Sequence, residues 1–471
     1  MNKYYFLILI LICAANLFAQ DKVELIHADS LSGKSINGVT VREAKGNVEF
    51  VQGNIKVYCN TATQYIDQNK LELIGNVRIY QDTLTLLTNR GTYYGNEKRA
   101  VGENGVTLKD PNATIRANNG VYYFNEAKAV FKGDVIIVNP EYRITSTELT
   151  YLRNTEDSFA KGNVVVTTDS AVVKAENIDF YKRQFKTYAY EKVVIDSDST
   201  LIYSDTLTHF SNTKESFAVG NVKVESLNNN TILYGNTLDH YENKNYSKMS
   251  GNAKLIQIDK NANDTLYIYS SLMEAFRNKP EYYLATDKVE IIRTNFYSKS
   301  GIGTFYKDSS KIALEKEPIV WQDNMQITGD SIFAELPGNK LQSIFVKKLS
   351  ITNSQPSFLI SQSTIPSFSD RYDQLRSRDI YIYIQDDKLD SVKAISNASS
   401  IYFIYEENKA NGVNNSEGDN IYIYLDKEEN SVSKIRLEKS VKGEYAPESE
   451  IGKTSLTLPG FNPRTDRPLR R

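Results

Sequence analysis

The residues best suited to chemistry in this sequence are two histidines, His209 and His240, at equivalent positions of neighbouring internal repeats. Asp205 and Asp239 lie close to them in the sequence, and imidazole with carboxylate is a donor set that binds divalent metals. In the other repeats this column holds mostly Tyr or Phe, so the simpler interpretation is that histidine replaces a flat ring. Structural zinc normally takes four N or S ligands. We therefore predict no metal site and no cofactor.

No other group of residues indicates catalysis. Asp386 and Asp387 form a charged turn, where solvated acids are expected, and Cys59 is best explained as a small buried residue. The nucleophile motif G-x-S-x-G, the phosphate-binding motif G-x-x-x-x-G-K-[ST] and the zinc motif H-E-x-x-H do not occur. The sequence predicts no catalytic residues and no enzyme activity.

The elements that position all these residues are internal repeats. The phrase Gly-Asn-Val occurs at Gly46, Gly75, Gly162 and Gly220, and related residues fill the same place at Asn104, Gly133 and Glu191, so that each step is 29 residues. Looser copies follow at Gly251, Asp287 and Glu317. A fixed period of this length is typical of stacked repeat proteins, in which one unit cannot bury its own apolar stripe but a stack can.

Apolar residues recur two positions apart in every repeat, which is the period of a β-strand with one buried face. Glycine followed by asparagine suits a tight bend between two strands, because both residues tolerate positive φ. The sequence predicts an all-β fold: an elongated, open β-jelly roll or β-solenoid of about nine to ten 29-residue repeats, with a smaller C-terminal β region. The predicted inward columns are Val48, Phe50, Val57, Val77, Ile79, Leu86, Val106, Ile115, Val135, Ile137, Ile144, Val164, Val166, Val173, Val193, Ile195, Ile202, Val222 and Val224.

Composition divides the chain into five segments. Residues 1–19 have a basic start, an apolar run and a small residue, Ala19, before the expected cleavage, which predicts a signal peptide and export. Residues 20–340 are the repeats, residues 341–379 a Ser- and Pro-containing linker or irregular rungs, and residues 380–457 a second β region. Residues 458–471 form an irregular basic tail, which is either a docking segment or a frayed end.

The formal net charge of −2 and the lack of a basic run argue against nucleic-acid binding. Two interpretations of the apolar inner face remain open. If this face is closed, it is only a core. If the sheets splay apart, it is a trough suited to acyl chains, and periodicity alone does not distinguish the two cases.

The repeat unit resembles a known family. Ala160-Lys161-Gly162-Asn163-Val164-Val165-Val166, followed by Ala175-Glu176-Asn177, is similar to the unit of OstA-like proteins. This family includes the LptA-type periplasmic bridge proteins of lipopolysaccharide export and the N-terminal domain of LptD. The resemblance covers about residues 23–321, and this chain has more repeats than the short bridge proteins.

The resemblance implies a periplasmic carrier, exported by its signal peptide and in part associated with the outer membrane, that shields lipopolysaccharide acyl chains. The inward columns listed above are then the lipid-binding residues. Lipopolysaccharide or a related lipid, the inner- and outer-membrane transport components and further copies of the chain are the expected partners. The alternatives are a structural β-solenoid that binds proteins through its end strands and a carbohydrate-binding β-helix.

Overall fold

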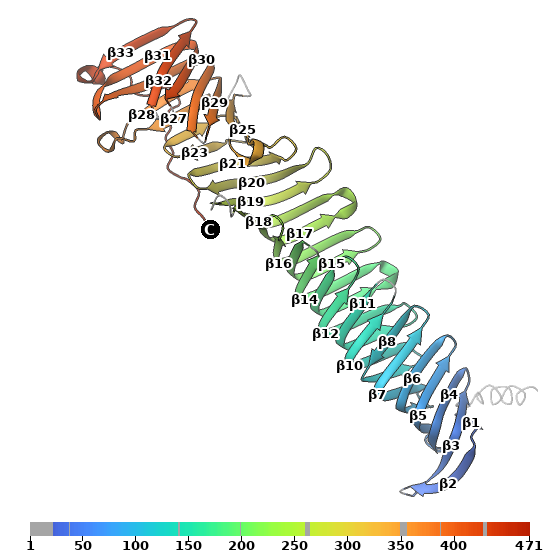
Figure 1. The fold of residues 1–471 in the computed structure, drawn as a ribbon. Helices are drawn as coiled ribbons and strands as arrows, with labels where there is room; N and C mark the ends of the chain where they lie inside the picture. The colour runs from blue at the N-terminus through green and yellow to red at the C-terminus, as the bar shows by residue number, and fades with distance from the viewer. Residues whose placement is uncertain are drawn as a thin grey trace, which may run out of the picture. The chain divides into compact units, whose positions relative to one another are not determined.

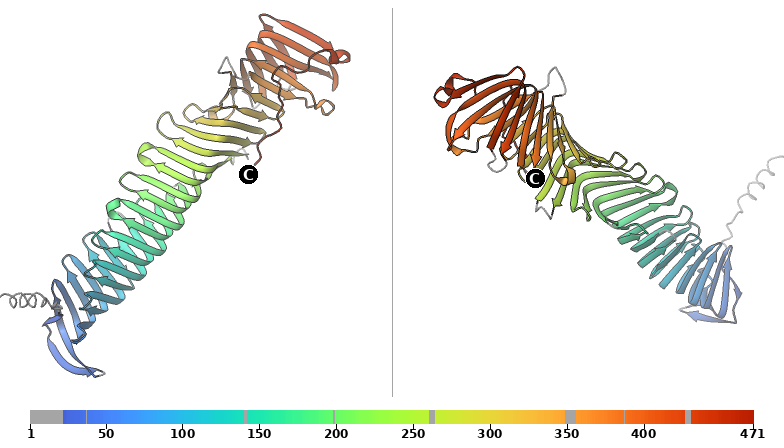
Figure 2. Two further views of the ribbon diagram at one scale, coloured as in Figure 1. Left: turned by 180° about the vertical axis from the view of Figure 1, so that it is seen from behind. Right: turned by 45° about the horizontal axis from the view of Figure 1, so that its top comes forward.

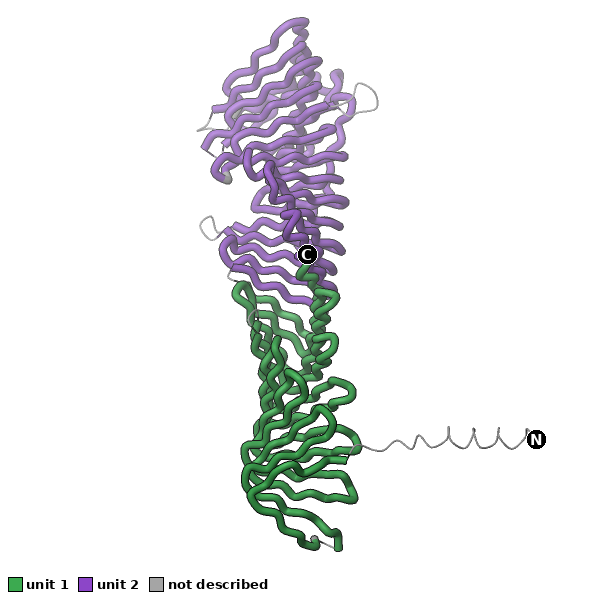
Figure 3. The backbone as a smooth tube through the Cα atoms, turned by 90° about the vertical axis from the view of Figure 1, so that its right-hand side faces the viewer, with its two compact units in different colours: residues 1–198, 206–212 green, residues 199–205, 213–471 purple. Residues whose placement is uncertain are grey.

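The computed structural model describes residues 22–36, 38–139, 142–197, 199–259, 264–348, 356–386, 388–426 and 431–471. The expected signal peptide lies outside these residues. The chain divides into two compact units, one of residues 1–198 and 206–212 and one of residues 199–205 and 213–471 (Figure 3). In the described part of the chain, no helix combines the length and the apolar character needed to cross a membrane.

Unit 1 is built almost entirely of strands that follow one another in chain order (Figures 1 and 2). Its elements are β1 (Glu24–His27), β2 (Ser30–Ile36), β3 (Val39–Gln52), β4 (Ile55–Tyr65), β5 (Lys70–Gln81), β6 (Leu84–Tyr94), β7 (Arg99–Asp110), β8 (Ala113–Ala117), β9 (Asn119–Tyr123), β10 (Lys128–Val138), β11 (Arg143–Leu152), β12 (Asp157–Thr167), β13 (Val172–Tyr181), the 3-10 helix η1 (Lys182–Gln184) and β14 (Lys186–Ser197). Strand β15 (Thr200–Phe210) contributes residues to both units.

Unit 2 continues with the same kind of element. Its elements are β16 (Glu215–Ser226), β17 (Thr231–Tyr241), η2 (Glu242–Lys244), β18 (Tyr246–Asp259), β19 (Asp264–Phe276), β20 (Tyr282–Arg293), β21 (Phe296–Tyr306), β22 (Lys311–Glu315), β23 (Ile319–Gln322), β24 (Met325–Thr328), β25 (Ser331–Glu335), η3 (Pro337–Asn339), β26 (Ser343–Lys347), β27 (Ser357–Gln362), η4 (Pro366–Phe368), β28 (Tyr372–Ser377), β29 (Asp379–Gln385), β30 (Lys388–Glu406), β31 (Lys409–Asp426), β32 (Ser431–Glu438), β33 (Lys442–Pro447) and η5 (Glu448–Lys453).

Neighbouring strands pair in antiparallel fashion along the chain. Strand β4 pairs with β3 and β5, and β17 pairs with β16 and β18. Each 29-residue repeat is therefore a hairpin of two successive strands. The predicted all-β jelly-roll class is confirmed.

The Gly-Asn pair makes the bend that the sequence predicts, but the bend lies inside a continuous strand rather than between two strands. In β5 the register shifts between Ile74 and Val77, where Gly75 and Asn76 have φ of 75° and 47°. Two successive residues in the left-handed region form a bulge that turns a strand sharply. The two halves of each strand face each other as a result, and their inward side chains form the apolar interior.

The corner of this bend explains why glycine recurs. A Cβ atom on Gly162, which has φ of 78°, would lie 2.7 Å from Oγ1 of Thr147 on the preceding strand. A short polar side chain packs on the glycine in the same way at Gly75 and Gly220, where the neighbours are Asn60 and Asp205. The amide of the following asparagine then hydrogen-bonds that side chain, as Asn221 does with Asp205 at 2.9 Å.

The same bend also occurs where the sequence has no Gly-Asn phrase. Successive positive φ angles occur at Glu191 and Lys192, at Asp287 and Lys288, and again far along the chain at Ser396–Asn397 and Lys439–Ser440. The last two pairs lie in the segment where the sequence repeat is no longer recognisable. The backbone pattern of bent strands therefore extends beyond the sequence pattern.

Candidate functional site

The interior of the first rungs of unit 1 is closed. The predicted inward residues of this part are at most 5% exposed, as in Val77 (1%) and Ile144 (5%). Buried and partly exposed residues alternate along β3 to β11, as expected for strands with one face in a core. Over the whole of both units, the predicted inward residues that are buried are Val48, Phe50, Val57, Val77, Ile79, Leu86, Val106, Ile115, Val135, Ile137, Ile144, Val164, Val193 and Val222.

Polar contacts close the mouth of this interior, on the side away from the bend. The Tyr93 hydroxyl donates to Oε1 of Gln52, and Nε2 of Gln52 donates to the carbonyl of Gly95 at 2.9 Å. The N–H of Val23 donates to Oδ1 of Asn69 at 2.9 Å, and the carbonyl of Val23 accepts from Nε2 of Gln64 at 3.0 Å. Burial raises the pKa of the Tyr93 phenol. These contacts join residues that are more than forty positions apart.

A second closure uses an ion pair. Nε of Arg153 donates to the Asp110 carboxylate at 2.9 Å, and its Nη2 donates to Oγ1 of Thr83 at 2.8 Å. The Asp110 side chain is only 6% exposed. One rung further, the rings of Tyr142 and Phe180 meet edge to face with centroids 5.6 Å apart. This last contact joins the residue before β11 to β13.

Sequence reasoning missed these closing residues, although a signal was present. Gln52, Gln81 and Asp110 are spaced by 29 residues and form a polar column at the ends of β3, β5 and β7. The structure places Gln52 against the buried Tyr93, and Asp110 against Arg153, whose side chain is 20% exposed.

The interior becomes more accessible from the second half of β12. In unit 1, Val166, Val173 and Ile195 form one cross-strand row and are each only half-buried. In unit 2 the same degree of exposure is found at the predicted residues Ile202 and Val224 and at three further aliphatic residues in register with Val224: Leu233, Leu255 and Ile268. These half-buried rows form the candidate lipid-binding site in each unit.

Beyond β19 the interior of unit 2 closes again. Val289, Ile291, Leu314, Val320 and Ile327 begin a continuous buried cluster that extends to Ile421 in β31. This part of the molecule has the character of a packed core. The half-buried rows are therefore a distinct section of the inward columns.

Two of the residues first considered for chemistry, Asp205 and His240, contact polar side chains of other types, and Asp205 accepts from Asn221. Nδ1 of His240 lies 2.8 Å from the Ser247 hydroxyl, which also accepts from Arg277 at 3.0 Å. No group of three or more His, Cys, Asp or Glu side chains in the described residues is arranged to hold a metal. Cys59 is buried and unpaired with another cysteine, and burial raises the pKa of its thiol to about 12.

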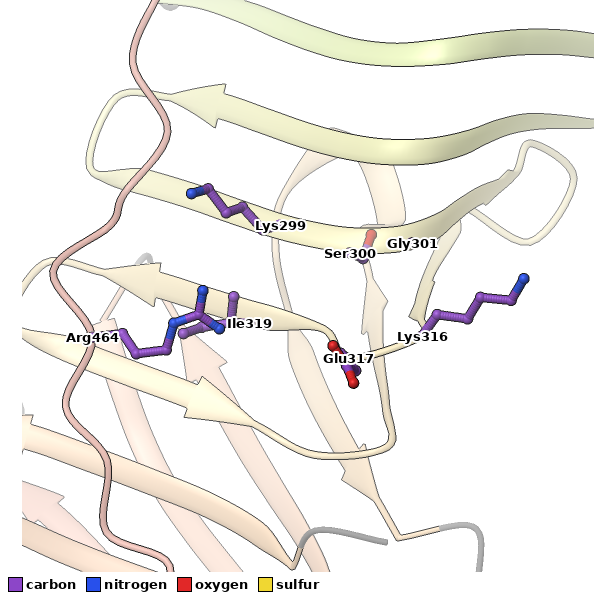
Figure 4. Close-up of a pocket in the computed structure, with 7 residues that line it drawn as sticks. All are labelled: Lys299, Ser300, Gly301, Lys316, Glu317, Ile319 and Arg464. Carbon is purple, nitrogen blue, oxygen red and sulfur yellow. The ribbon is translucent and has the colours of Figure 1, made fainter.

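Two open pockets lie on the surface of the units. In unit 2, a pocket of about 620 Å³ is lined by Lys299, Ser300, Gly301, Lys316, Glu317, Ile319 and Arg464, and Figure 4 shows Arg464 lying over Ile319. In unit 1, a smaller pocket of about 230 Å³ surrounds the Arg153–Asp110 pair. Its polar groups already bond one another, as Asn112 does with Glu156 at 3.1 Å.

The bent antiparallel strands around an apolar interior define the chain as a β-jelly-roll protein. The family model described as "OstA-like protein" matches residues 20–119, so this segment is similar to OstA-like proteins and the resemblance is confirmed over those residues. The comparison with curated proteins gives no match.

One similar solved structure is LptH of Pseudomonas aeruginosa, described as the LptA-homologous periplasmic component of the lipopolysaccharide transport device. It matches 31% of this chain over 82% of its own length, with 14% identity and a TM-score of 0.16.

Proposed function

We propose that this chain is a periplasmic protein of the lipopolysaccharide-transport type, which shields acyl chains in the half-buried rows of its interior. The support is the OstA-like segment at residues 20–119 together with an aliphatic inner face. Burying a hydrocarbon chain against such a face contributes about 0.8 kcal/mol per methylene. Inner- and outer-membrane transport components are the proposed partners, because nothing on an aliphatic face gives transport a direction.

The observation that carries this proposal is the change in exposure along the inward columns. Val164 is 1% exposed, whereas Val166, two residues later on the same face, is half-buried. A core that only stabilises the fold has no need of this change. We therefore assign lipid binding to Val166, Val173 and Ile195 in unit 1 and to Ile202 and Val224 in unit 2. The inward residues that are at most 5% exposed, Val193 and Val222 included, are not assigned to it.

Site-specific photo-crosslinking in the full chain tests the assignment. A benzophenone amino acid at Val173 is expected to form a lipopolysaccharide adduct in cells, detected with an antibody to the lipid. The same probe at Val77, which is 1% exposed, is the matched control and is expected to form none. Absence of an adduct at every half-buried position, including Leu233 in unit 2, would refute the carrier function.

A structural role is the second candidate, and the sealed interior from Val48 to Val164 favours it. In that case the protein binds partners through end strands such as β1 and β2, both of which pair with β3. Mass spectrometry of the natively purified protein separates the two functions. A carrier retains lipid, whereas a scaffold is lipid-free even when it is purified from lipopolysaccharide-containing cells.

A further inference from the structure

Residues 456–471, here called the strap, run back along unit 2 from β28 to β18 without forming a helix or strand (Figures 1 and 2). They follow one cross-strand row on the outer face of the sheet. The row, here called the outer row, crosses seven strands in register: Tyr267, Ile292, Tyr297, Trp321, Gln326, Ile360 and Gln374. Their chain neighbours Ile291, Ile327, Leu359 and Leu375 belong to the interior core, so the outer row faces away from it.

The outer row is buried although it lies on the outside of the sheet. Ile292, Trp321 and Ile360 are 0%, 1% and 3% exposed, and the strap residue Pro468 is itself buried. Strands that are covered on both faces carry continuous apolar runs, as β23 (Ile319–Gln322) does. The strap supplies the second cover.

The outer row recognises the main chain of the strap. Nε2 of Gln374 donates to the carbonyl of Leu456 at 2.9 Å, and its Oε1 accepts from the N–H of Leu458 at 2.8 Å. Gln326 repeats this arrangement, with the carbonyl of Asn462 at 2.9 Å and the N–H of Arg464 at 2.7 Å.

Each glutamine thus contacts a carbonyl and the N–H two residues later, which are the groups that an extended chain presents to one side. Gln326 is 7% exposed and Gln374 is 3% exposed, so the side-chain amides of both residues are held in place.

Further contacts select the type of side chain. The guanidinium groups of Arg467 and Arg470 lie 5.7 and 5.2 Å from the ring centres of Tyr297 and Tyr267, within the range of cation–π attraction. The indole Nε1 of Trp321 donates to the carbonyl of Arg464 at 3.1 Å. Arg467 and Arg470, three residues apart, therefore match tyrosines on β21 and β19, which are separated by one strand.

We propose that the outer row is a binding site for an extended peptide containing arginine and proline, and that the strap is its resident, exchangeable occupant. The strap has the features of a ligand rather than of a core element. Its arginines are exposed, and Pro468 is the one buried residue in residues 456–471. Recognition through main-chain groups tolerates a second peptide of the same chemistry. This site lies on the opposite face from the proposed lipid rows and does not depend on them.

Trp321 is the only tryptophan in the sequence and reports directly on occupancy. The test uses the full chain with Arg467→Ser, Pro468→Ser and Arg470→Ser, which weaken the strap and leave the outer row intact. The tryptophan emission is expected to shift to longer wavelength and to become quenchable by acrylamide. A synthetic peptide of residues 456–471 added to this variant is expected to restore protection in a saturable manner.

The controls use the same fluorescence signal. A scrambled peptide of identical composition is expected to leave Trp321 quenchable. Trp321 of the unmodified chain is expected to stay protected from acrylamide whether or not the peptide is added, because its own strap occupies the outer row at high effective concentration. Three results overturn the proposal: Trp321 remains protected in the variant, the authentic peptide fails to restore protection, or the variant loses its β-sheet circular dichroism.

Discussion

The guanidinium of Arg153 and the carboxylate of Asp110 are joined across the mouth of the unit 1 interior by a hydrogen bond of 2.9 Å. Asp110 is the last residue of β7, and Arg153 directly follows β11. The pair is largely shielded, with side-chain exposures of 20% for Arg153 and 6% for Asp110. Closure of the first rungs thus depends on a tertiary contact between charged groups as well as on apolar packing.

Removal of this carboxylate is expected to destabilise unit 1. Asp110→Ala leaves the guanidinium largely shielded without its counter-ion, which is expected to cost about 2 kcal/mol of unfolding free energy. Urea denaturation followed by circular dichroism measures the change. Glu148→Ala is the control, because it breaks an exposed pair with Lys132 and is expected to cost less than about 0.5 kcal/mol. Equal losses in the two variants would contradict the shielded role of Asp110.

The corner glycines predict a second effect on stability. Gly162→Ala places a Cβ atom 2.7 Å from Oγ1 of Thr147 at a positive φ, so a loss of about 1–3 kcal/mol is expected. Gly33→Ala in β2 is the matched control, because its Cβ atom meets nothing within 4 Å and its φ is not positive. Thermal unfolding of both variants gives the comparison. Equal losses of stability in the Gly162→Ala and Gly33→Ala variants would show that the bend does not need glycine.

The two sections of the inner face are expected to respond differently to a charge. Val164→Asp buries an unpaired carboxylate in the sealed section and is expected to cost at least about 3 kcal/mol. Val173→Asp lies in the half-buried row, where water reaches the carboxylate, and a cost of about 1 kcal/mol is expected. Denaturation of both variants and lipid retention by Val173→Asp are the measurements. A reversed order of the two losses would refute the assignment of the sealed and open sections.

Asp373 predicts a pH dependence for unit 2. Its carboxylate accepts from the N–H of Phe403 at 2.9 Å, but desolvation raises its pKa from 3.8 to about 7. The folded state therefore holds this proton more tightly than the unfolded state. The resulting contribution is complete below about pH 3.8 and is lost as the pH rises to about 7.

Asp373→Asn is expected to reduce the loss of stability between pH 5 and pH 8, because the amide does not titrate. Urea midpoints at the two pH values, for wild type and variant, measure the effect. Wild-type and variant midpoints that fall by the same amount over this interval would show that Asp373 is not the titrating group.

Much of the fold could be predicted from the sequence. The 29-residue period, the alternation around Val77 and Ile79 and the positive φ of Gly75 and Asn76 are properties of short segments, and each is visible in the residue types. The recurrence of the bend at Ser396 could not be predicted in this way. Once the neighbouring strands are bent, pairing imposes the bend on the next strand without a glycine.

The candidate site was predictable only in part. The sequence identified the inward columns, since strand alternation assigns each side chain to a face. It did not distinguish the sealed residue Val164 from the half-buried residue Val166, because both are valines on that face. Their exposure depends on whether a remote residue covers the mouth.

The amino-acid sequence by itself determined the strands, their bends and the inward face, because these follow from backbone sterics and the two-residue period. Only the tertiary structure decided where the interior is closed and where the outer face is covered. Arg153 reaches Thr83 over 70 positions of the chain, and Arg464 meets Trp321 over 143. Contacts at such separations have no local pattern, since they arise only after the strands have stacked.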